Sequence, residues 1–355
     1  MLRLSVREIE CTSEILAMLR RRYRDAQVQE LLIDAPVHAR RLPLRVQEYI
    51  NAFRRQESGY GVISGYPVDD AEIGPTPRHW NHLPPMSPTL DHDLLLVLYA
   101  ALLGDAFGWA TQQDGRIIHD VLPIKEDEGG LLSSTADVPL GWHTEDAFHP
   151  CRPDWVLLAC IRNPTETATT IAMVDDLELD EHDVTVLFEP RFRIVPDDSH
   201  LPQHNSSEST VSAAIERHCR TSSAVPILCG DSTHPYIGAD QDFCDVSDPG
   251  DADARAALRR LAEEIDRRLH DIVLRPGDFC FLDNFKVVHG RRSFPAIDVL
   301  HDGGDARPNV SVRDERGEAI PQVKLGSGSC SQRWGQLGSS GDDHPPEGVA
   351  SHVRR

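Results

Sequence analysis

The chain has 355 residues, and its 57 Asp and Glu residues outnumber its 36 Lys and Arg residues, giving a formal net charge of −21. A surface this acidic argues against binding to nucleic acids or anionic membranes, because both require basic patches. The N-terminal residues lack the apolar run of a secretory signal, and no apolar run reaches the roughly 18 residues of a membrane span. We therefore expect a cytoplasmic protein that binds neither nucleic acid nor membrane, with an oligomeric state that the sequence leaves open.

The first third of the chain is expected to be largely helical. In the N-terminal part, about residues 1–58, apolar residues recur at intervals of three and four. A short apolar run bounded by glycines predicts a strand at 60–65. The proline-rich stretch 67–88 predicts a long loop, and a helix is expected from about 91 to 103, where Gly104 ends it.

From about residue 107 to residue 200 the pattern changes to short strands separated by turns. Two near-continuous apolar runs, at 155–161 and 169–174, predict buried strands. The polar segment 196–211 predicts a loop, either a plain surface loop or a lid over a site.

The clearest helical pattern begins at Asp251, with an apolar stripe at i, i+3 and i+4 spacing that reaches about residue 271. Two short strands around a turn at 275–278 then lead to His289. Many short strands with one late helix predict a mainly β fold with peripheral helices, in the form of an antiparallel sandwich or jelly roll.

These patterns define the expected domain organisation. We assign residues 1–325 to a single domain, with the strand-rich core at about 60–297 and an inserted helix at about 251–271. The segment 326–355 is rich in glycine and serine, which predicts a disordered tail.

Two histidines and a carboxylate carry the most specific chemical information. His143 and Glu145 have H-x-E spacing, and alternate residues of a strand point to the same face. Together with His289 they can form the 2-His-1-carboxylate triad of non-haem Fe(II) oxygenases, which leaves coordination positions open for substrate and O2. A catalytic zinc site has the same ligand types and stays open as an alternative. The eight cysteines contain no C-x-x-C pair, which disfavours a structural zinc site.

The surroundings of these residues resemble a known family. Trp-His-Thr-Glu-Asp-Ala-Phe-His-Pro, Pro-Asp-Asp-Ser-His-Leu-Pro and Asp-Asn-Phe-Lys-Val-Val-His-Gly-Arg are similar to motifs of the clavaminate synthase-like dioxygenases of the TauD/TfdA superfamily. Within it, the free L-arginine β-hydroxylases of the viomycin type are the most similar branch. The similarity spans about residues 55 to 296. It implies a double-stranded β-helix core, Fe(II) as the metal, and 2-oxoglutarate and O2 as cosubstrates.

The resemblance also implies roles for single residues. His143, Glu145 and His289 would ligate iron, and Thr170 would contact 2-oxoglutarate, although a β-branched residue is also what any strand favours. Family members hold the 2-oxoglutarate carboxylate with an arginine about fourteen residues after the distal histidine. This chain has Gly303 there, and Arg307 is the nearest candidate.

Four further residues match substrate-binding positions. Gln112 falls where the family binds the substrate α-amine, and Asp197 lies in the lid-like Pro-Asp-Asp-Ser-His segment. Asp240 and Asp242 match the acidic pair that holds a guanidinium, a planar cation with several donors that suits two carboxylates. The alternatives are a polar loop residue at Gln112, a turn-capping aspartate at Asp197, and an acidic surface loop at Asp240 and Asp242.

The sequence therefore predicts an Fe(II)/2-oxoglutarate-dependent hydroxylase of a free basic amino acid, with L-arginine favoured. The enzyme would oxidise C3 or C4 while 2-oxoglutarate and O2 become succinate and CO2. One alternative is a desaturase, or a hydroxylase of another amino acid such as lysine, citrulline or a pipecolate-like compound. A non-catalytic jelly-roll binding protein with a degraded C-terminus is the alternative from a different class.

Overall fold

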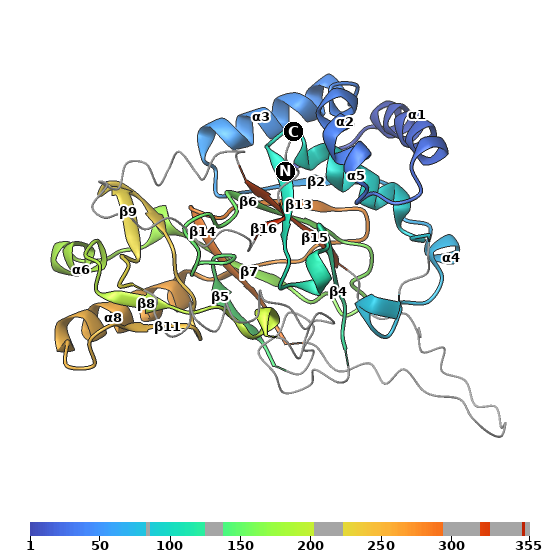
Figure 1. The fold of residues 1–355 in the computed structure, drawn as a ribbon. Coiled ribbons are helices and arrows are strands. Elements are labelled where there is room, and N and C mark those ends of the chain that lie inside the picture. The colour runs from blue at the N-terminus through green and yellow to red at the C-terminus, as the bar shows by residue number, and fades with distance from the viewer. Residues whose placement is uncertain (83–85, 125–137, 202–222, 294–319, 327–349, 352–355) are drawn as a thin grey trace, which may run out of the picture.

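The computed structural model describes residues 1–82, 86–124, 138–201, 223–293, 320–326 and 350–351 (Figure 1). Two β-sheets lie at the centre of these residues, and helices surround them. The larger sheet has eight strands, and its pairings are antiparallel except for the first pair. In spatial order its strands are β1 (Leu2–Arg3), β2 (Tyr60–Ser64), β13 (Phe279–Asp283), β6 (Trp155–Ala159), β15 (Ile320–Gly326), β3 (Asp105–Trp109) and β16 (Ala350–Ser351), with β4 (Ile118–Val121) paired to β15.

The smaller sheet has four antiparallel strands in the order β12 (His270–Ile272), β7 (Thr169–Met173), β14 (Val287–Arg291) and β5 (Leu140–His143). Its register places His289 of β14 directly opposite His143 of β5. On the other side of β14, His289 is opposite Ile171 of β7. The smaller sheet therefore brings together two histidines that are far apart in the sequence.

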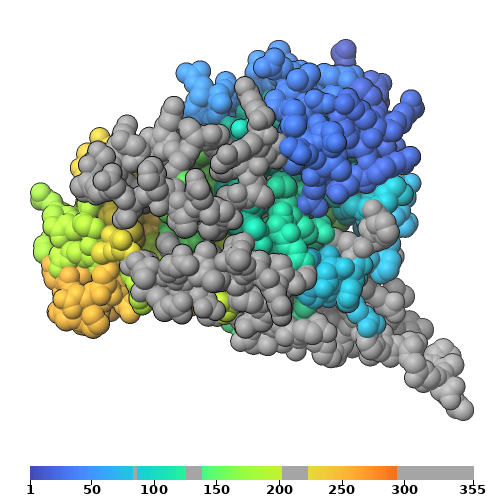
Figure 2. Space-filling view, in the orientation of Figure 1, coloured from blue at the N-terminus to red at the C-terminus, as the bar shows by residue number. Residues whose placement is uncertain are grey.

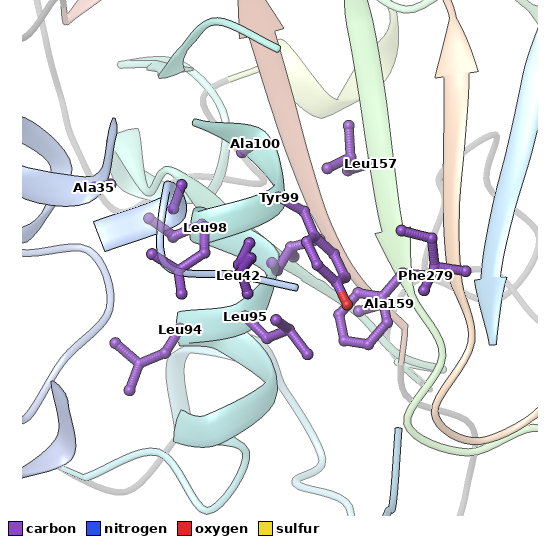
Figure 3. Packing of buried hydrophobic residues seen from close by; sticks show 14 of the residues in the cluster. Ala35, Leu42, Leu94, Leu95, Leu98, Tyr99, Ala100, Leu157, Ala159 and Phe279 are labelled. Atoms are coloured by element: carbon purple, nitrogen blue, oxygen red, sulfur yellow. The ribbon is translucent and has the colours of Figure 1, made fainter. Parts of the chain in front are cut away.

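Four N-terminal helices cover one side of the larger sheet: α1 (Val6–Arg22), α2 (Gln29–Ala39), α3 (Leu44–Gln56) and α5 (Leu90–Ala100). Helix α5 is apolar on nearly every face, which is the pattern of a helix buried on all sides. Figure 3 shows Leu94 and Leu98 on the side of α5 turned to the N-terminal helices, while Tyr99 points to the strands. The Tyr99 ring packs edge-on against Phe279 of β13, with centroids 5.1 Å apart.

A second group of elements lies beyond the smaller sheet: α6 (Glu181–Leu187), β8 (Phe192–Ile194), β9 (Leu228–Asp231), β10 (His234–Ile237), β11 (Cys244–Val246) and α8 (Ala252–Arg268). The apolar stripe of α8, including Leu261 and Ile265, packs with Leu187 and Phe192 in a separate hydrophobic core. A salt bridge between Arg260 of α8 and the buried Asp183 of α6 joins the two helices. In the space-filling view this group and the N-terminal helices occupy opposite ends of the molecule (Figure 2).

The described residues form a sheet-rich fold with peripheral helices, as the sequence predicted. The strand expected at 60–65 is β2. The expectation of a plain loop at 67–88 is wrong, because this stretch contains α4 (Asp70–Ile73), capped by Asp69, and a 3-10 turn, η1 (Trp80–His82). No helix among the described residues has both the length and the apolar composition to cross a membrane.

The C-terminal part contains a strand that the sequence pattern did not indicate. β15 lies in the middle of the larger sheet, between β6 and the strands β3 and β4. A proline near its start and the lack of an alternating apolar pattern hide it, because proline usually argues against a central strand. Within the tail expected at 326–355, Gly326 ends β15 and Ala350–Ser351 pairs with β3, and the other residues lie outside the described ones.

Candidate metal centre and its surroundings

The three proposed ligands meet beside the smaller sheet. The rings of His143 and His289 have centroids 4.5 Å apart. The carboxylate oxygen Oε2 of Glu145 lies 3.8 Å from Nε2 of His143 and 3.6 Å from Nε2 of His289. These are the separations expected of groups that can share one ion.

The residues present fit a single divalent ion. Histidine nitrogen and carboxylate oxygen bind such ions at about 2.0–2.2 Å, so two ligands of one ion can lie up to about 4.3 Å apart. All three ligand atoms lie within 4.8 Å of one another, and both separations from Glu145 fall inside the limit. Two imidazoles and one carboxylate without a thiolate suit non-haem Fe(II) and leave coordination positions open.

His143 is oriented for ligation by its own strand. Its Nδ1 lies 2.9 Å from the carbonyl oxygen of Gly141, so Nδ1–H donates there and Nε2 is directed to the metal position. Burial lowers the pKa of His143, but the Glu145 carboxylate and the charge of Asp240 outweigh this effect and raise the pKa to about 9. A metal ion at this position therefore competes with a proton for Nε2.

Glu145 is held differently from the way that strand alternation predicts. Strand β5 ends at His143, and Asp146 has a left-handed backbone with φ of 53°, so Glu145 lies at the start of a turn. Asn284 fixes this turn: its Oδ1 accepts the Glu145 N–H at 2.7 Å, and its Nδ2 donates to the Glu145 carbonyl at 2.9 Å. Asn284 is fully buried in the β13–β14 connection, so the segment that carries His289 also positions Glu145.

Thr144, between the two ligands, uses its hydroxyl away from the metal. The hydroxyl donates to the Ala239 carbonyl at 3.2 Å and accepts from Nη1 of Arg152 at 2.7 Å. Arg152 is buried, stacks on the Phe285 ring and donates through Nη2 to the Ile237 carbonyl. The H-x-E motif is thereby tied to the segment 237–240, which leads to the proposed substrate residues Asp240 and Asp242.

Thr170 lies next to the metal strand. It is buried on β7 and pairs with Gly290, the residue after His289. A Cβ atom at Gly290 would stand 3.0 Å from the Thr170 hydroxyl and 2.6 Å from the Leu140 carbonyl oxygen, so this close approach requires glycine. Arg307 and Gly303, the other residues considered for 2-oxoglutarate, lie outside the described residues.

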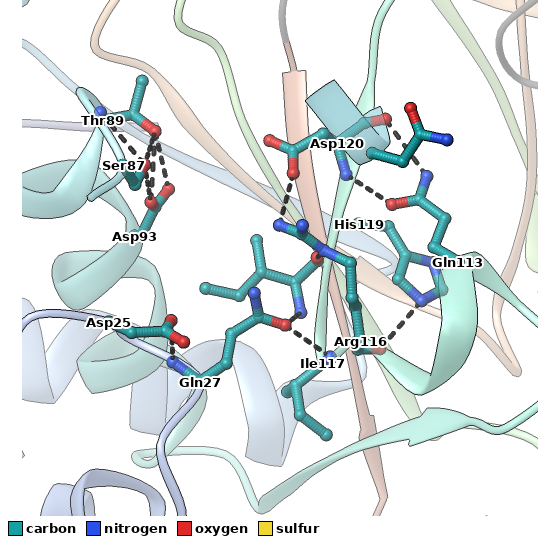
Figure 4. A network of polar contacts seen from close by, with 12 residues as sticks. Asp25, Gln27, Ser87, Thr89, Asp93, Gln113, Arg116, Ile117, His119 and Asp120 are labelled. Carbon is teal, nitrogen blue, oxygen red and sulfur yellow. Dashed lines mark hydrogen bonds and ion pairs between the residues drawn. The ribbon is translucent and has the colours of Figure 1, made fainter. Parts of the chain in front are cut away.

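Gln112 is presented by a tight turn after β3. Gln113, Asp114 and Gly115, which form η2, all have positive φ, at 42°, 58° and 82°. The Gln113 side chain pairs with the Asp120 backbone, donating to its carbonyl at 3.2 Å and accepting its N–H at 3.0 Å (Figure 4). Gln27 from the N-terminal helical part accepts the N–H groups of Ile117 and Ile118 with one oxygen. The turn is therefore braced from outside the site.

Gln112 and Asp197 are brought together through Ser199. The buried Gln112 donates through Nε2 to the Ser199 hydroxyl at 2.6 Å. Asp197 caps the 3-10 turn η5 (Asp198–His200) by accepting the Ser199 N–H at 2.8 Å. One carboxylate oxygen of Asp197 thus has the turn-capping role that was the alternative to substrate binding.

Asp240 and Asp242 lie beside β5, on the side away from its partner strand β14. Asp240 forms an isolated β-bridge with His143 and accepts the N–H groups of Asp242 and Phe243. Burial raises the pKa of Asp240 to about 6, although the charge of His143 opposes this. Asp242 is exposed, and its Oδ2 would lie 2.7 Å from a Cβ atom at Gly141. Asp240 is thus paired with His143 itself, and the Asp242 carboxylate lies beside Gly141, two residues earlier in the same strand.

Sequence reasoning missed the residues that hold the site together. Asn284 was visible in the Asp-Asn-Phe-Lys-Val-Val-His-Gly-Arg run, but nothing in its spacing shows that its side chain reaches Glu145. Arg152 and His200 were missed for the same reason: their partners are 85 and 54 positions away in the chain. Long-range contacts of this kind leave no periodic signal.

Comparisons with known proteins agree on the kind of protein. Residues 96–302 match the family described as taurine catabolism dioxygenase TauD, TfdA family. The L-ornithine/L-arginine 3-hydroxylase of Catenulispora acidiphila is 42% identical over 317 residues, which cover 86% of this chain and 91% of that protein. The enduracididine beta-hydroxylase of Streptomyces hygroscopicus is 39% identical over 289 residues, which cover 78% of this chain and 84% of that protein.

Solved structures give the same picture. The non-heme iron oxygenase OrfP in complex with Fe, succinate and (3S)-hydroxy-L-Arg superposes with a TM-score of 0.83 at 36% identity, covering 92% of this chain and 94% of that chain. OrfP in complex with Fe and alpha-ketoglutaric acid superposes with a TM-score of 0.78 at 35% identity, with the same coverage.

Proposed function

The chain belongs to the TauD/TfdA dioxygenase family, and from this membership we propose that it hydroxylates a free basic amino acid, with L-arginine as the substrate. It is a non-haem Fe(II)/2-oxoglutarate-dependent oxygenase. We place the new hydroxyl group on C3, because two similar relatives are named as a 3-hydroxylase and a beta-hydroxylase. We further infer that its two main sheets are the halves of a double-stranded β-helix, which their mainly antiparallel pairings support.

The observation that carries this proposal is the set of carboxylates beside the triad. Asp197 is near enough to Asp240 that its charge contributes to the raised pKa of Asp240, and Asp242 lies against Gly141, two residues before His143. Arginine carries two cationic groups, the α-ammonium and the guanidinium. Acidic side chains on two loops can hold one cationic group each, and charge-assisted hydrogen bonds to them are stronger than neutral ones.

We assign roles to the chain's own residues on this basis. His143, Glu145 and His289 hold the iron, and Thr170 contacts 2-oxoglutarate. Gln112 and Asp197 bind the α-amino end of the substrate, while Asp240 and Asp242 bind its guanidinium. Arg307 remains our predicted partner for the 2-oxoglutarate carboxylate, and the single domain at 1–325 and the cytoplasmic location also remain predictions.

The iron, when bound with 2-oxoglutarate, supplies an O2-dependent oxidation that replaces a C–H bond by C–OH while 2-oxoglutarate becomes succinate and CO2. The contribution of the protein is to hold the substrate by both ends, so that one carbon faces the metal. Because both ends are held, the substrate cannot rotate freely, so binding energy is used to keep the reacting carbon in place. A short shift along the side chain would present C4 instead of C3.

Succinate release tests the proposal. The purified protein with Fe(II), ascorbate and 2-oxoglutarate is offered arginine, ornithine, lysine and citrulline in parallel. We expect the highest kcat/KM with arginine, and a much lower value with citrulline, which has nearly the same shape but a neutral urea group. Equal values for arginine and citrulline would contradict guanidinium recognition. No succinate above the substrate-free rate with any of the four would contradict the amino-acid hydroxylase.

A further inference from the structure

A buried group of four side chains lies next to the triad without belonging to it. Trp109 donates through Nε1 to Oδ2 of Asp146 at 2.6 Å. His200 contacts the other oxygen of Asp146 through Nε2 at 3.2 Å, and its Nδ1 lies 2.7 Å from the Thr111 hydroxyl. The side chains of His200 and Asp146 are both 0% exposed.

The histidine is the centre of this group. With Asp146 ionised, Nε2 of His200 must carry a hydrogen, and Nδ1 of a neutral ring then accepts from the Thr111 hydroxyl. The ring also packs edge-on against Phe148, with centroids 5.0 Å apart. Two hydrogen bonds and the contact with Phe148 hold the His200 ring in one orientation. The ring therefore fixes the segments that carry its partners relative to one another.

The three segments joined by His200 are the ones that carry proposed site residues. Thr111 precedes Gln112, Asp146 follows Glu145, and His200 ends the turn η5 that Asp197 caps. A second link, from Gln112 to Ser199, runs parallel to the first. The turn η5 is therefore fixed at one side to the turn of Gln112 and at the other to the metal motif.

Asp146, Asp197 and His200 also offer ligand atoms within 4.8 Å of one another, as a metal site would. Both oxygens of Asp146 and both nitrogens of His200 already have hydrogen-bond partners among the described residues. These three contacts account for the four buried polar atoms of the pair without an ion. We interpret the cluster as a structural link and not as a second metal centre.

We propose that His200 is a positioning residue, which sets the distance between the turn η5 and Glu145 so that the substrate's amino end is bound at a fixed place relative to the metal. This inference rests on the proposed function. The His200 side chain hydrogen-bonds to Asp146 and Thr111, which are neighbours in sequence of Glu145 and Gln112, and its backbone N–H donates to the Asp197 carbonyl at 3.2 Å within the turn η5. Its loss should therefore loosen substrate binding and placement while leaving the metal centre able to form.

Loose placement has a measurable consequence in an oxygenase. A substrate held in the wrong place allows 2-oxoglutarate to be converted to succinate without a matching hydroxylated product. If the loss of the hydrogen bond to the charged Asp146 falls on substrate binding, it corresponds to about a tenfold or larger change in affinity. We expect this change in the KM and the Kd for arginine, together with a higher ratio of succinate to hydroxyarginine.

The experiment compares His200→Phe with His92→Phe. Both replace a buried histidine that packs against an aromatic ring, but His92 lies on α5 and contacts the Pro67 carbonyl, far from the triad in the fold. Three readouts are taken: the visible band of the anaerobic Fe(II)–2-oxoglutarate enzyme without amino acid, the arginine Kd by calorimetry under the same conditions, and the succinate-to-product ratio. His200→Gln, which can keep a donor near Asp146, should recover part of the coupling.

The inference predicts a normal band for His200→Phe, an arginine Kd and KM raised about tenfold or more, and poorer coupling, with His92→Phe like the wild type. Unchanged Kd and coupling in His200→Phe would overturn it. Loss of the band would also overturn it, because His200 would then support the metal and not the substrate. If His200→Phe does not fold, Thr111→Val, which removes one bond, must shift Kd and coupling in the same direction by a smaller factor.

The wild-type arm separates this inference from the proposed function. A wild type that makes no succinate with arginine contradicts the proposed function, whatever the variants do. A wild type that turns over arginine, with variants that bind and couple equally well, contradicts only the role of His200.

Discussion

The proposed metal ligands are held by a different kind of structure from the proposed substrate contacts. His143 and His289 are paired across neighbouring strands of the smaller sheet. Glu145 is gripped through its backbone by the buried Asn284. Strand pairing and backbone clamping leave these three groups little freedom. A metal centre needs this, because small errors in ligand placement weaken binding.

The proposed substrate contacts stand on turns. Gln112 precedes a turn of three residues with positive φ, and Asp197 caps η5. Asp240 lies in the short connection after β10 and caps the backbone of the next residues. Turns of this kind can change in sequence without disturbing the sheets. We infer from this contrast that paired strands and the Asn284 clamp fix the proposed metal site, while the turns select the amino acid.

The largest effect is expected from the metal ligands. In Glu145→Ala the two histidines lose the carboxylate that shares the ion, so Fe(II) affinity should fall by at least about 100-fold and hydroxylation should disappear. Metal titration followed by intrinsic fluorescence measures the affinity. Retained iron affinity and turnover would show that another residue supplies the third ligand.

Asn284 tests whether the backbone clamp matters as much as the ligands. Asn284→Leu keeps the volume but removes both hydrogen bonds to Glu145, and we expect a loss of about 10- to 100-fold in iron affinity or kcat. Asn163 is a matched control, since its buried amide also donates to backbone carbonyls, those of Thr167 and Leu274. Asn163→Leu should lower the Tm without changing iron affinity. Equal iron affinities in the two variants would refute the clamp.

These two tests also mark what the sequence could predict. The proposed ligands His143, Glu145 and His289 follow from motif spacing and resemblance, and the structure brings their ligand atoms within 4.8 Å of one another. The clamp does not, because the spacing gives no sign that Asn284 reaches a backbone 139 positions away. The strand argument for H-x-E was only half correct, since β5 stops at His143 and a turn carries Glu145.

The fold shows the same division. Apolar periodicity located the buried strands β6 and β7 and the amphipathic α8, which ends at Arg268 and not at about residue 271, because β12 begins at His270. β15 was missed although it pairs with β6 in the middle of the larger sheet. Its place depends on which strands it pairs with, and a seven-residue strand with a proline gives no local sign of that.

A smaller effect is expected from the turn that carries Asp240 and Asp242, where a substitution should change only the preference between amino acids. Asp242→Asn removes one charge near the guanidinium, so kcat/KM for arginine should fall about tenfold while that for citrulline changes little. Asp245→Asn removes a charge from the same exposed stretch and should leave kcat/KM unchanged for both amino acids. Parallel kinetics with the two amino acids measure the difference. If Asp242→Asn lowers kcat/KM equally for arginine and for citrulline, Asp242 does not bind the guanidinium.

The smallest effect on activity is expected from the outer brace. Gln27→Ala leaves the buried N–H groups of Ile117 and Ile118 without their acceptor, at a cost of about 1–3 kcal/mol in the free energy of unfolding. Because Gln112 is also fixed by Ser199, the KM for arginine should change by less than a factor of about three. Denaturant unfolding and steady-state kinetics measure both. A large rise in KM without loss of stability would mean that the turn depends on the N-terminal helices for its substrate contact.

Incorporation of oxygen into arginine tests the central claim most directly. The protein is incubated with Fe(II), 2-oxoglutarate, L-arginine and isotopically labelled O2, and the amino acid is examined by mass spectrometry and NMR. We expect one labelled oxygen atom in arginine, attached at C3, with one succinate formed for each product molecule. Arginine recovered unlabelled, from protein that binds Fe(II) at His143, Glu145 and His289, would contradict it.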